Sequence, residues 1–358
     1  MLVQTHFPRK LSRVRYDQYL ASGWFRGAVM LYKMDLLCID DELFSVVNIR
    51  VKLDDFIFRK SQRKLLRKVD SRFRTVFGDA NPTEEKEALY TAHKHRFKGF
   101  IHATLAEYLK AGFDTTVFDT REVCIYDEDK LIAVSYFDMG ENSMASLLGL
   151  YDERYAEWSL GKVTMLKEIG FGIENDTNWY YPGYILDKDS SFDYKLELGS
   201  TEFYTPNNSW VDFSKYNPAK THGYEIRLNT DKLCKQLTNI GIPHKQWLYP
   251  YFSMGHLGPW NAYFMSDPAP VELGHDLEGM MVATYSSIEK AYSLYSINPC
   301  PDGSHLLNLE ASDEFSNSTA YLNHLYQTGD CILIHGTLEI LIELIKVWKS
   351  KPHYIPPS

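Results

Sequence analysis

The residues best suited to chemistry lie between Thr120 and Lys195, where strand-like segments surround the start of one helix. The tripeptide Ser159-Leu160-Gly161 stands where a strand gives way to that helix. The first N–H groups of a helix lack intrahelical partners, so this junction can face a polyanionic or carbonyl-bearing donor. Gly161 also lets another backbone approach closely. The same pattern is typical of a glycine that packs one helix on another, so acyl transfer and packing both stay open here.

A strongly basic segment is the second chemical feature. Residues 59–74 contain eight Lys/Arg and one acid, Asp70. The apolar residues Phe58, Leu65, Leu66 and Val69 predict a helix over 56–68 that lies on a core. Solvated helix faces usually mix both signs of charge, so this face favours phosphate binding over simple exposure.

Histidines and cysteines do not form a metal pattern. His93 and His95 lack i, i+4 spacing, and His256 and His335 fall at turns, which favours structural or solvated roles. The five cysteines, at 38, 124, 234, 300 and 331, contain no CxxC pair. This scatter predicts reduced thiols of a cytoplasmic protein and no zinc site.

Composition places the chain among folded proteins with two or three domains. It has 358 residues, of which 44% are hydrophobic and 14% aromatic. No apolar run is long enough to cross a membrane, and no apolar segment follows the basic N-terminus, so neither a membrane span nor a secretory signal is predicted. The net charge of −9 conceals an asymmetry, because residues 1–74 carry a net +8 and the rest a net −17. A basic front on an acidic body keeps a nucleic-acid partner possible.

The expected elements alternate between helices and strands. Helices are predicted at 12–26, 56–68, 83–108, 156–171 and 337–349, and strands at 29–32, 44–51, 123–126, 130–137, 143–150 and 179–186. The order strand-strand-strand-helix-strand between 123 and 186 resembles one half of an acetyltransferase (GNAT) fold.

Several stretches together resemble the aminoacyl-tRNA–protein transferase family. Leu20 to Arg26 and Phe56 to Lys68 are similar to the GWRR and SQRRVLRR stretches of its front domain, and the segment with Leu89-Tyr90 and His95 is similar to its LY…RH segment. The later matches keep the family order over about residues 12–210: Leu131 to Val134, Asp138, Tyr151-Asp152, Tyr155, Ser159-Leu160-Gly161, Glu168-Ile169, Gly183-Tyr184-Ile185 and Tyr194-Lys195.

The resemblance implies a fold and an activity. The fold is α+β, with acetyltransferase-like (GNAT) halves in tandem and an additional C-terminal α/β region. The expected segments are a basic N-terminal domain (1–80), a GNAT-like aminoacyl transferase domain (81–211) and a C-terminal extension of unknown role (212–358). The implied reaction moves an amino acid, with arginine favoured, from charged tRNA to the N-terminal amine of proteins that begin with Asp or Glu. No cofactor, metal, membrane or DNA partner is expected.

The resemblance also implies three sets of site residues. The backbone around Ser159, Leu160 and Gly161 faces the aminoacyl ester. The substrate-binding set is Tyr151, Tyr184, Tyr194 and Lys195. The set that holds tRNA phosphates or, in part, the acidic acceptor is Arg26, Arg63, Lys64, Arg67 and Lys68.

Departures from the family leave alternatives open. Family members carry a cysteine cluster near the front, where this chain has only Cys38, so a cluster-bound metal is not expected. Leucine is the alternative amino acid. An N-acyltransferase with another donor would need an Arg/Gln-x-x-Gly-x-Gly/Ala loop, which Trp158 to Lys162 does not supply. A relative that binds tRNA or protein without catalysis is the third alternative.

Overall fold

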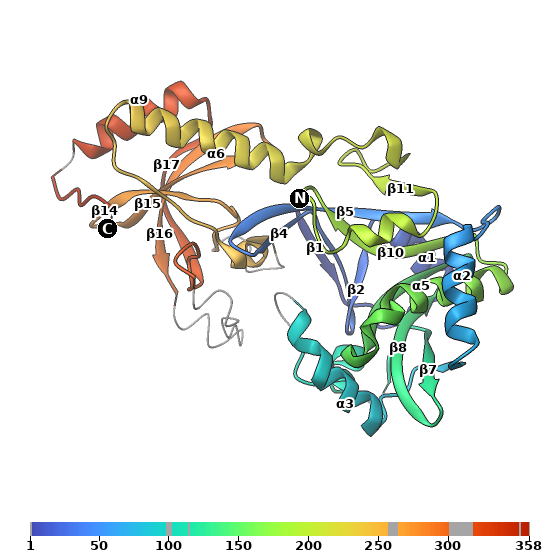
Figure 1. Ribbon diagram of the computed structural model, residues 1–358. Coiled ribbons are helices and arrows are strands. Elements are labelled where there is room, and N and C mark those ends of the chain that lie inside the picture. The colour runs from blue at the N-terminus through green and yellow to red at the C-terminus, as the bar shows by residue number, and fades with distance from the viewer. Residues whose placement is uncertain are drawn as a thin grey trace. The chain divides into compact units, whose positions relative to one another are not determined.

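The computed structural model describes residues 2–97, 102–113, 115–256, 264–300, 318–350 and 352–357 (Figure 1). They form two compact units. Unit 1 comprises Met1–Gln4, Met34–Val46 and Asn217–Ser358, and unit 2 comprises Thr5–Lys33 and Val47–Tyr216. The segment 1–80, expected as a domain of its own, contributes residues to both units, whereas the later division falls close to the expected one at 211/212.

Unit 2 is built on a mixed sheet. From one edge to the other its strands are β12 (Trp210–Asp212), β11 (Thr201–Tyr204), β5 (Glu42–Lys52), β10 (Trp179–Leu186), β9 (Ser143–Tyr151), β8 (Lys130–Met139), β7 (Thr120–Asp127) and β6 (Arg74–Asp79). Strands β6 to β9 pair antiparallel, and β10 then pairs parallel to β9. This order confirms the α+β class and the acetyltransferase-like half. The first residues of β5 belong to unit 1, where they pair with β4 (Leu36–Ile39).

The helices of unit 2 arise where apolar residues recur at helical spacing. They are α1 (Arg13–Ala21), α2 (Lys60–Asp70), α3 (Glu84–His93), α4 (Leu105–Lys110) and α5 (Leu160–Glu174), with short 3₁₀ helices η1 (Lys94–Arg96), η2 (Glu153–Trp158), η3 (Asp193–Glu197) and η4 (Phe213–Lys215). Helix α5 buries Val163, Leu166 and Ile169 against the sheet, and α2 lies beside it (Figure 1). An ion pair between Lys167 and Asp70 joins the two helices. A smaller sheet has the order β1 (Val3–His6), β3 (Met30–Met34), β2 (Phe25–Gly27).

The prediction of a single long helix over residues 83–108 is wrong. Helix α3 ends at His93, η1 follows, and Phe97 is extended at φ −79° and ψ 149°. A new helix begins at Leu105, because Thr104 and Glu107 form a capping box in which each side chain bonds the other residue's backbone. Two apolar residues of the expected range, Phe100 and Ile101, lie outside the described residues. Thr-x-x-Glu is a start signal that apolar periodicity alone overlooks.

Unit 1 contains a second sheet, ordered β13 (Lys245–Gln246), β14 (Val271–Asp276), β15 (Gly279–Ser286), β16 (Ala291–Pro299), β17 (Tyr326–Gly336), and all neighbours pair antiparallel. Helices α6 (His222–Asn239) and α9 (Leu338–Lys349) pack on it, and short 3₁₀ helices η5 (Pro218–Lys220) and η6 (Pro250–His256) occur nearby in the chain (Figure 1). Like unit 2, this unit has an antiparallel run of strands followed by a helix. Within the described ranges, no helix is both long and apolar enough to span a bilayer.

Candidate active site

Strands β9 and β10 run parallel but pair over only a short stretch. The paired residues of β10 are Trp179 to Tyr181. The next two are Pro182, which has no N–H to donate, and Gly183, which adopts a positive φ of 97°. The carboxyl-terminal halves of the two strands are therefore unpaired with each other. Helix α5 follows one of them, through η2, and η3 follows the other.

The start of α5 has an unusual backbone. Ser159 is exposed and takes the left-handed conformation at φ 52°. Its carbonyl accepts from the N–H groups of Lys162 and Val163, so the N–H groups of Leu160 and Gly161 occupy the positions that lack intrahelical partners. The Leu160 side chain is fully buried at 0% exposure. Any role of Leu160 at this site therefore belongs to its backbone.

Tyr151 flanks this helix start. A Cβ added to Gly161 would lie 3.6 Å from the Tyr151 ring. The Tyr151 carbonyl oxygen lies 3.0 Å from His93 Nδ1, and burial lowers the pKa of that imidazole. The Tyr151 hydroxyl accepts a hydrogen bond from Arg96. The end of α3 and its following 3₁₀ turn are thereby held beside the first turn of α5.

Lys195 lies on η3, against β10. Its Nζ donates to the Tyr184 carbonyl at 3.0 Å and lies 5.2 Å and 5.0 Å from the ring centroids of Tyr184 and Phe192. Burial lowers the pKa of this ammonium to about 8. A Cβ at Gly183 would lie 3.3 Å from Nζ, so this glycine provides room for it. Tyr194 stands beside it with 40% of its surface exposed.

Contacts through η3 connect these parts. Lys162, in the first turn of α5, forms an ion pair with Glu197 at the end of η3. Gln62, which is buried on α2, donates to the carbonyls of Glu197 and Leu198 at 3.0 and 2.9 Å. The structure therefore brings the α5 start, η3 and the basic helix α2 together within unit 2.

The basic residues of α2 point to solvent. Arg63, Lys64, Arg67 and Lys68 are all exposed. Arg63 donates to the Phe58 carbonyl and Arg67 to the Arg63 carbonyl, and Lys68 Nζ lies 4.1 Å from the ring centroid of Trp158. No carboxylate contacts these four cations among the described residues, so their charge is available to a phosphate.

Arg26 is buried and does not lie with the exposed cations of α2. The prediction that it binds phosphate is therefore wrong. Its side chain is 1% exposed and forms an ion pair with Asp138 at 2.6 Å. It also donates to Thr120 Oγ1 and to the carbonyls of Ala28 and Leu109. Because its donors are used inside the protein, no phosphate can reach them. Arg26 instead fastens β2 to β7, β8 and α4.

Glu168 is a buried acid beneath this site. It lies on the sheet-facing side of α5 and accepts from Ser135 on β8 and from Tyr180 on β10, the latter at 2.7 Å. Burial raises its pKa to about 7 despite these hydrogen bonds. The network joins α5 to two strands just where β10 parts from β9. The sequence resemblance included Glu168 but gave it no role.

Arg96 and His93 were not selected from the sequence. The available signal was the basic run from His93 to Arg96, which is also typical of a helix end and so says little alone. Contacts with Tyr151, which lies more than fifty residues later, bring both to the candidate site.

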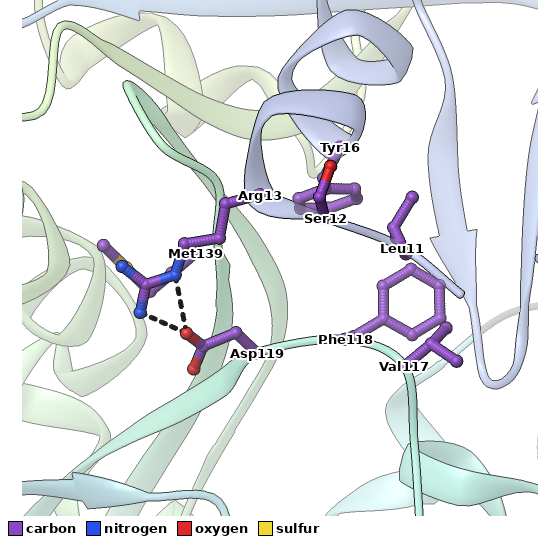
Figure 2. Close-up of a pocket in the computed structure, with 8 residues that line it drawn as sticks. All are labelled: Leu11, Ser12, Arg13, Tyr16, Val117, Phe118, Asp119 and Met139. Carbon is purple, nitrogen blue, oxygen red and sulfur yellow. Dashed lines mark hydrogen bonds and ion pairs between the residues drawn. The ribbon is translucent and has the colours of Figure 1, made fainter.

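A small cavity lies elsewhere in unit 2 (Figure 2). It has a volume of about 30 Å³, room for about one water and far too little for an amino acid or nucleotide. Figure 2 shows Arg13 reaching Asp119 beside it. The cavity is lined by Leu11, Ser12, Arg13, Tyr16, Val117, Phe118, Asp119 and Met139. Its size therefore excludes it as the site for either substrate.

Metal-binding groups are not assembled in the described part of the chain. No set of three or more His, Cys, Asp or Glu side chains there is placed to hold an ion. Cys38, the one cysteine before Cys124, is 3% exposed and packs in the core of unit 1. A single buried thiol does not fit the iron–sulfur or metal cluster of some family members, because such clusters need several cysteines.

The candidate site lies in a part of the chain that is similar to a known protein family. A family model described as "Arginine-tRNA-protein transferase, C terminus" matches residues 81–205. This range holds every predicted catalytic and substrate-binding residue and leaves out α2.

Curated relatives extend the similarity. An aspartate/glutamate leucyltransferase of Leptospira interrogans is 26% identical over 220 residues, which cover 58% of this chain and 84% of the relative. One of Campylobacter jejuni is 28% identical over 198 residues, or 53% of this chain and 77% of the relative. Among solved structures, a fungal protein with a GCN5-related glucosamine N-acetyltransferase region aligns at a TM-score of 0.31 and 14% identity, covering 56% of this chain and 23% of that one.

Proposed function

We propose that the chain acts as a member of the aminoacyl-tRNA–protein transferase family, whose model it matches over residues 81–205, and that it transfers an amino acid from charged tRNA to the N-terminal amine of proteins that begin with Asp or Glu. The observation that carries the proposal is the assembly in unit 2 of an α5 start whose first two N–H groups lie at positions without intrahelical partners, the η3 lysine and an exposed basic helix.

The reaction is the aminolysis of an ester. The acceptor's amine nitrogen attacks the ester carbonyl carbon, a tetrahedral oxyanion forms, and the C–O bond to the tRNA ribose then breaks. The amine proton leaves with the departing ribose oxygen, so no net proton or electron is required. An N-terminal amine has a pKa of about 7.7–8.0, so a usable fraction is neutral at pH 7 without a strong base.

The start of α5 supplies what the oxyanion needs. The N–H groups of Leu160 and Gly161 are fixed by the helix before substrate binds and stand at the positive end of its dipole. Donors of this kind stabilise the intermediate more than the ester, which is the condition for catalysis. Tyr151, packed against Gly161, limits the space over the carbonyl.

The tRNA contacts divide between two surfaces. Tyr184, Tyr194 and Lys195 lie together at η3 and β10, where aromatic rings and one cation suit the terminal nucleotides. Arg63, Lys64, Arg67 and Lys68 form an exposed basic face on α2 that suits the phosphates of the acceptor stem.

A transfer assay tests the proposal. The purified protein is mixed with radiolabelled arginyl-tRNA or leucyl-tRNA and a peptide that begins with Asp, and label in the peptide is counted. Label from either tRNA supports the proposal and identifies the amino acid, for which arginine was favoured from sequence and leucine is the one in the relatives' names. Acetyl-CoA replaces the tRNA as a control donor. Transfer from acetyl-CoA alone, or tight tRNA binding without transfer, would sink the proposal.

A further inference from the structure

We propose that Arg96, held on the ring of Tyr151, binds the side-chain carboxylate of the acceptor's N-terminal Asp or Glu. The inference deepens the proposed function and rests on it. It assigns recognition of the acidic acceptor to a residue outside the basic helix α2.

The first argument is position. Arg96 donates to the Tyr151 hydroxyl, and its guanidinium carbon lies 5.0 Å from the centroid of the Tyr151 ring. That ring lies 3.6 Å from the Cβ position of Gly161. Arg96 is therefore one aromatic side chain away from the N–H groups that face the ester carbonyl. The side chain of an N-terminal residue must lie within a few ångströms of the amine that attacks there.

The second argument is available charge. Three other cations of this neighbourhood already have carboxylate partners: Arg154 and Lys130 bond Asp152, and Lys162 bonds Glu197. Arg96 is 42% exposed, and among the described residues the acid that approaches it is Glu153, which lies 3.7 Å from Nη1. That distance is too long for a hydrogen bond. In the described residues, Nε and Nη2 have no partner, so a planar pair of donors remains for a carboxylate.

The third argument is preorganisation. Contact with the ring face and with the hydroxyl restricts the guanidinium before any ligand arrives. His93 fixes the other end of Tyr151 through the backbone carbonyl at 3.0 Å. Less side-chain freedom is then lost when the acceptor binds.

The charge environment favours a carboxylate over a phosphate. Glu153 lies beside both Arg96 and His95, the latter at 3.3 Å, and Asp152 precedes it in the chain. These acids oppose a polyanionic backbone but tolerate one carboxylate on one arginine. The phosphates instead meet the α2 face, whose four cations contact no acid among the described residues.

Acceptor discrimination tests the inference. Wild type, Arg96→Gln and Arg96→Lys are compared on peptides that begin with Asp or Asn and are otherwise identical. Loss of a charge-assisted hydrogen bond costs about 1.5–3 kcal/mol, so Arg96→Gln is expected to lower the Asp-over-Asn ratio of kcat/KM about 10- to 100-fold. The change should lie in KM for the Asp peptide, and Arg96→Lys should restore part of the ratio. An unchanged ratio in Arg96→Gln overturns the inference.

Two further variants separate recognition from structure. Arg154→Gln removes a nearby cation that is more exposed, at 75% against 42% for Arg96, but is already bound to Asp152, and it should leave the ratio unchanged. Glu153→Gln removes the acid nearest Arg96, and it should raise the ratio a few-fold. A purely structural role for Arg96 predicts neither the peptide-specific loss nor this gain.

Equilibrium binding keeps the two proposals distinguishable. The fluorescence anisotropy of labelled Asp and Asn peptides is measured with wild type and Arg96→Gln in the absence of tRNA. If wild type transfers nothing but binds the Asp peptide more tightly through Arg96, the proposed function fails and the inference stands. If wild type transfers label but binds both peptides equally, or if Arg96→Gln keeps the preference, the inference fails alone.

Discussion

Arg26 and Arg96 define two regions of unit 2 that use the same side chain in opposite ways. Arg26 is 1% exposed and its guanidinium is enclosed by Asp138, Thr120 and backbone carbonyls. Arg96 is 42% exposed and rests on one tyrosine, and among the described residues its carboxylate contact is Glu153 at 3.7 Å, beyond hydrogen-bond range. The comparison teaches that an arginine whose donors are filled by the fold contributes to architecture, whereas one held by a ring and a hydroxyl keeps donors for a ligand.

The largest effect is expected at the enclosed arginine. Arg26→Met leaves Asp138 buried without its cation, which should lower the free energy of unfolding by about 3–5 kcal/mol in urea titrations. Burial already raises the pKa of Asp138, and losing Arg26 raises it further. The variant should therefore lose more stability at pH 8 than at pH 5. Near-normal stability combined with weak tRNA binding would break the comparison.

Arg13→Ala is the matched control for that prediction. Its ion pair with Asp119 is 45% and 30% exposed, so solvent screens it. The expected loss is below about 1 kcal/mol.

The buried carboxyl of Glu168 gives a second test of the enclosed region, through the pH dependence of stability. Its pKa is raised from 4.5 to about 7 in the folded protein, so the folded state binds a proton more tightly than the unfolded state. The stability from this group is full below pH 4.5 and is lost as pH rises through about 7, a difference of about 3 kcal/mol. Glu168→Gln should flatten this loss, measured as the unfolding free energy from pH 5 to 8. If the unfolding free energy of variant and wild type depended on pH in the same way, burial would not destabilise the ionised Glu168 carboxylate as inferred.

A substitution at Gly161 tests the region that is proposed to face the aminoacyl ester. Gly161→Val should place methyl groups against Tyr151 and over the adjacent N–H groups, lowering single-turnover transfer about 10²-fold, or about 2.7 kcal/mol. Gly161→Ala should cost much less, because its Cβ meets Tyr151 at an ordinary contact distance of 3.6 Å. Thermal unfolding should not fall in either variant, since glycine is a poor helix former. Full activity in Gly161→Val would remove this helix start from the mechanism.

The smallest effects are expected on α2. Arg63→Gln and Arg67→Gln should each weaken tRNA binding by about 1 kcal/mol, or about fivefold, and make it less dependent on salt. Arg72→Gln serves as a control, because that arginine is already paired with Asp127 at 2.8 Å. Filter binding at several salt concentrations measures all three. If Arg72→Gln and Arg63→Gln lowered tRNA affinity equally, an existing ion pair with a carboxylate would not decide which cations bind tRNA.

Much of the fold followed from local pattern. The strands β7 to β10 and helix α5 were placed within a few residues, because alternating and helical apolar spacing are properties of neighbours in the chain. The break in the 83–108 helix was overlooked, because the apolar periodicity continues past the end of α3 at His93, while the capping box at Thr104 starts a separate helix at Leu105.

The site divides in the same way. Ser159-Leu160-Gly161 at a strand-to-helix junction, and a helix with one sign of charge, are visible in the residues themselves, because both depend on spacing within one segment. The burial of Arg26 and the exposure of Arg96 cannot be seen in the sequence. Arg26 is buried by partners as distant as Thr120 and Asp138, and Arg96 gains its place from Tyr151. Burial and hydrogen-bond supply are set by whatever segments pack against a side chain, so they exist only after the chain has folded.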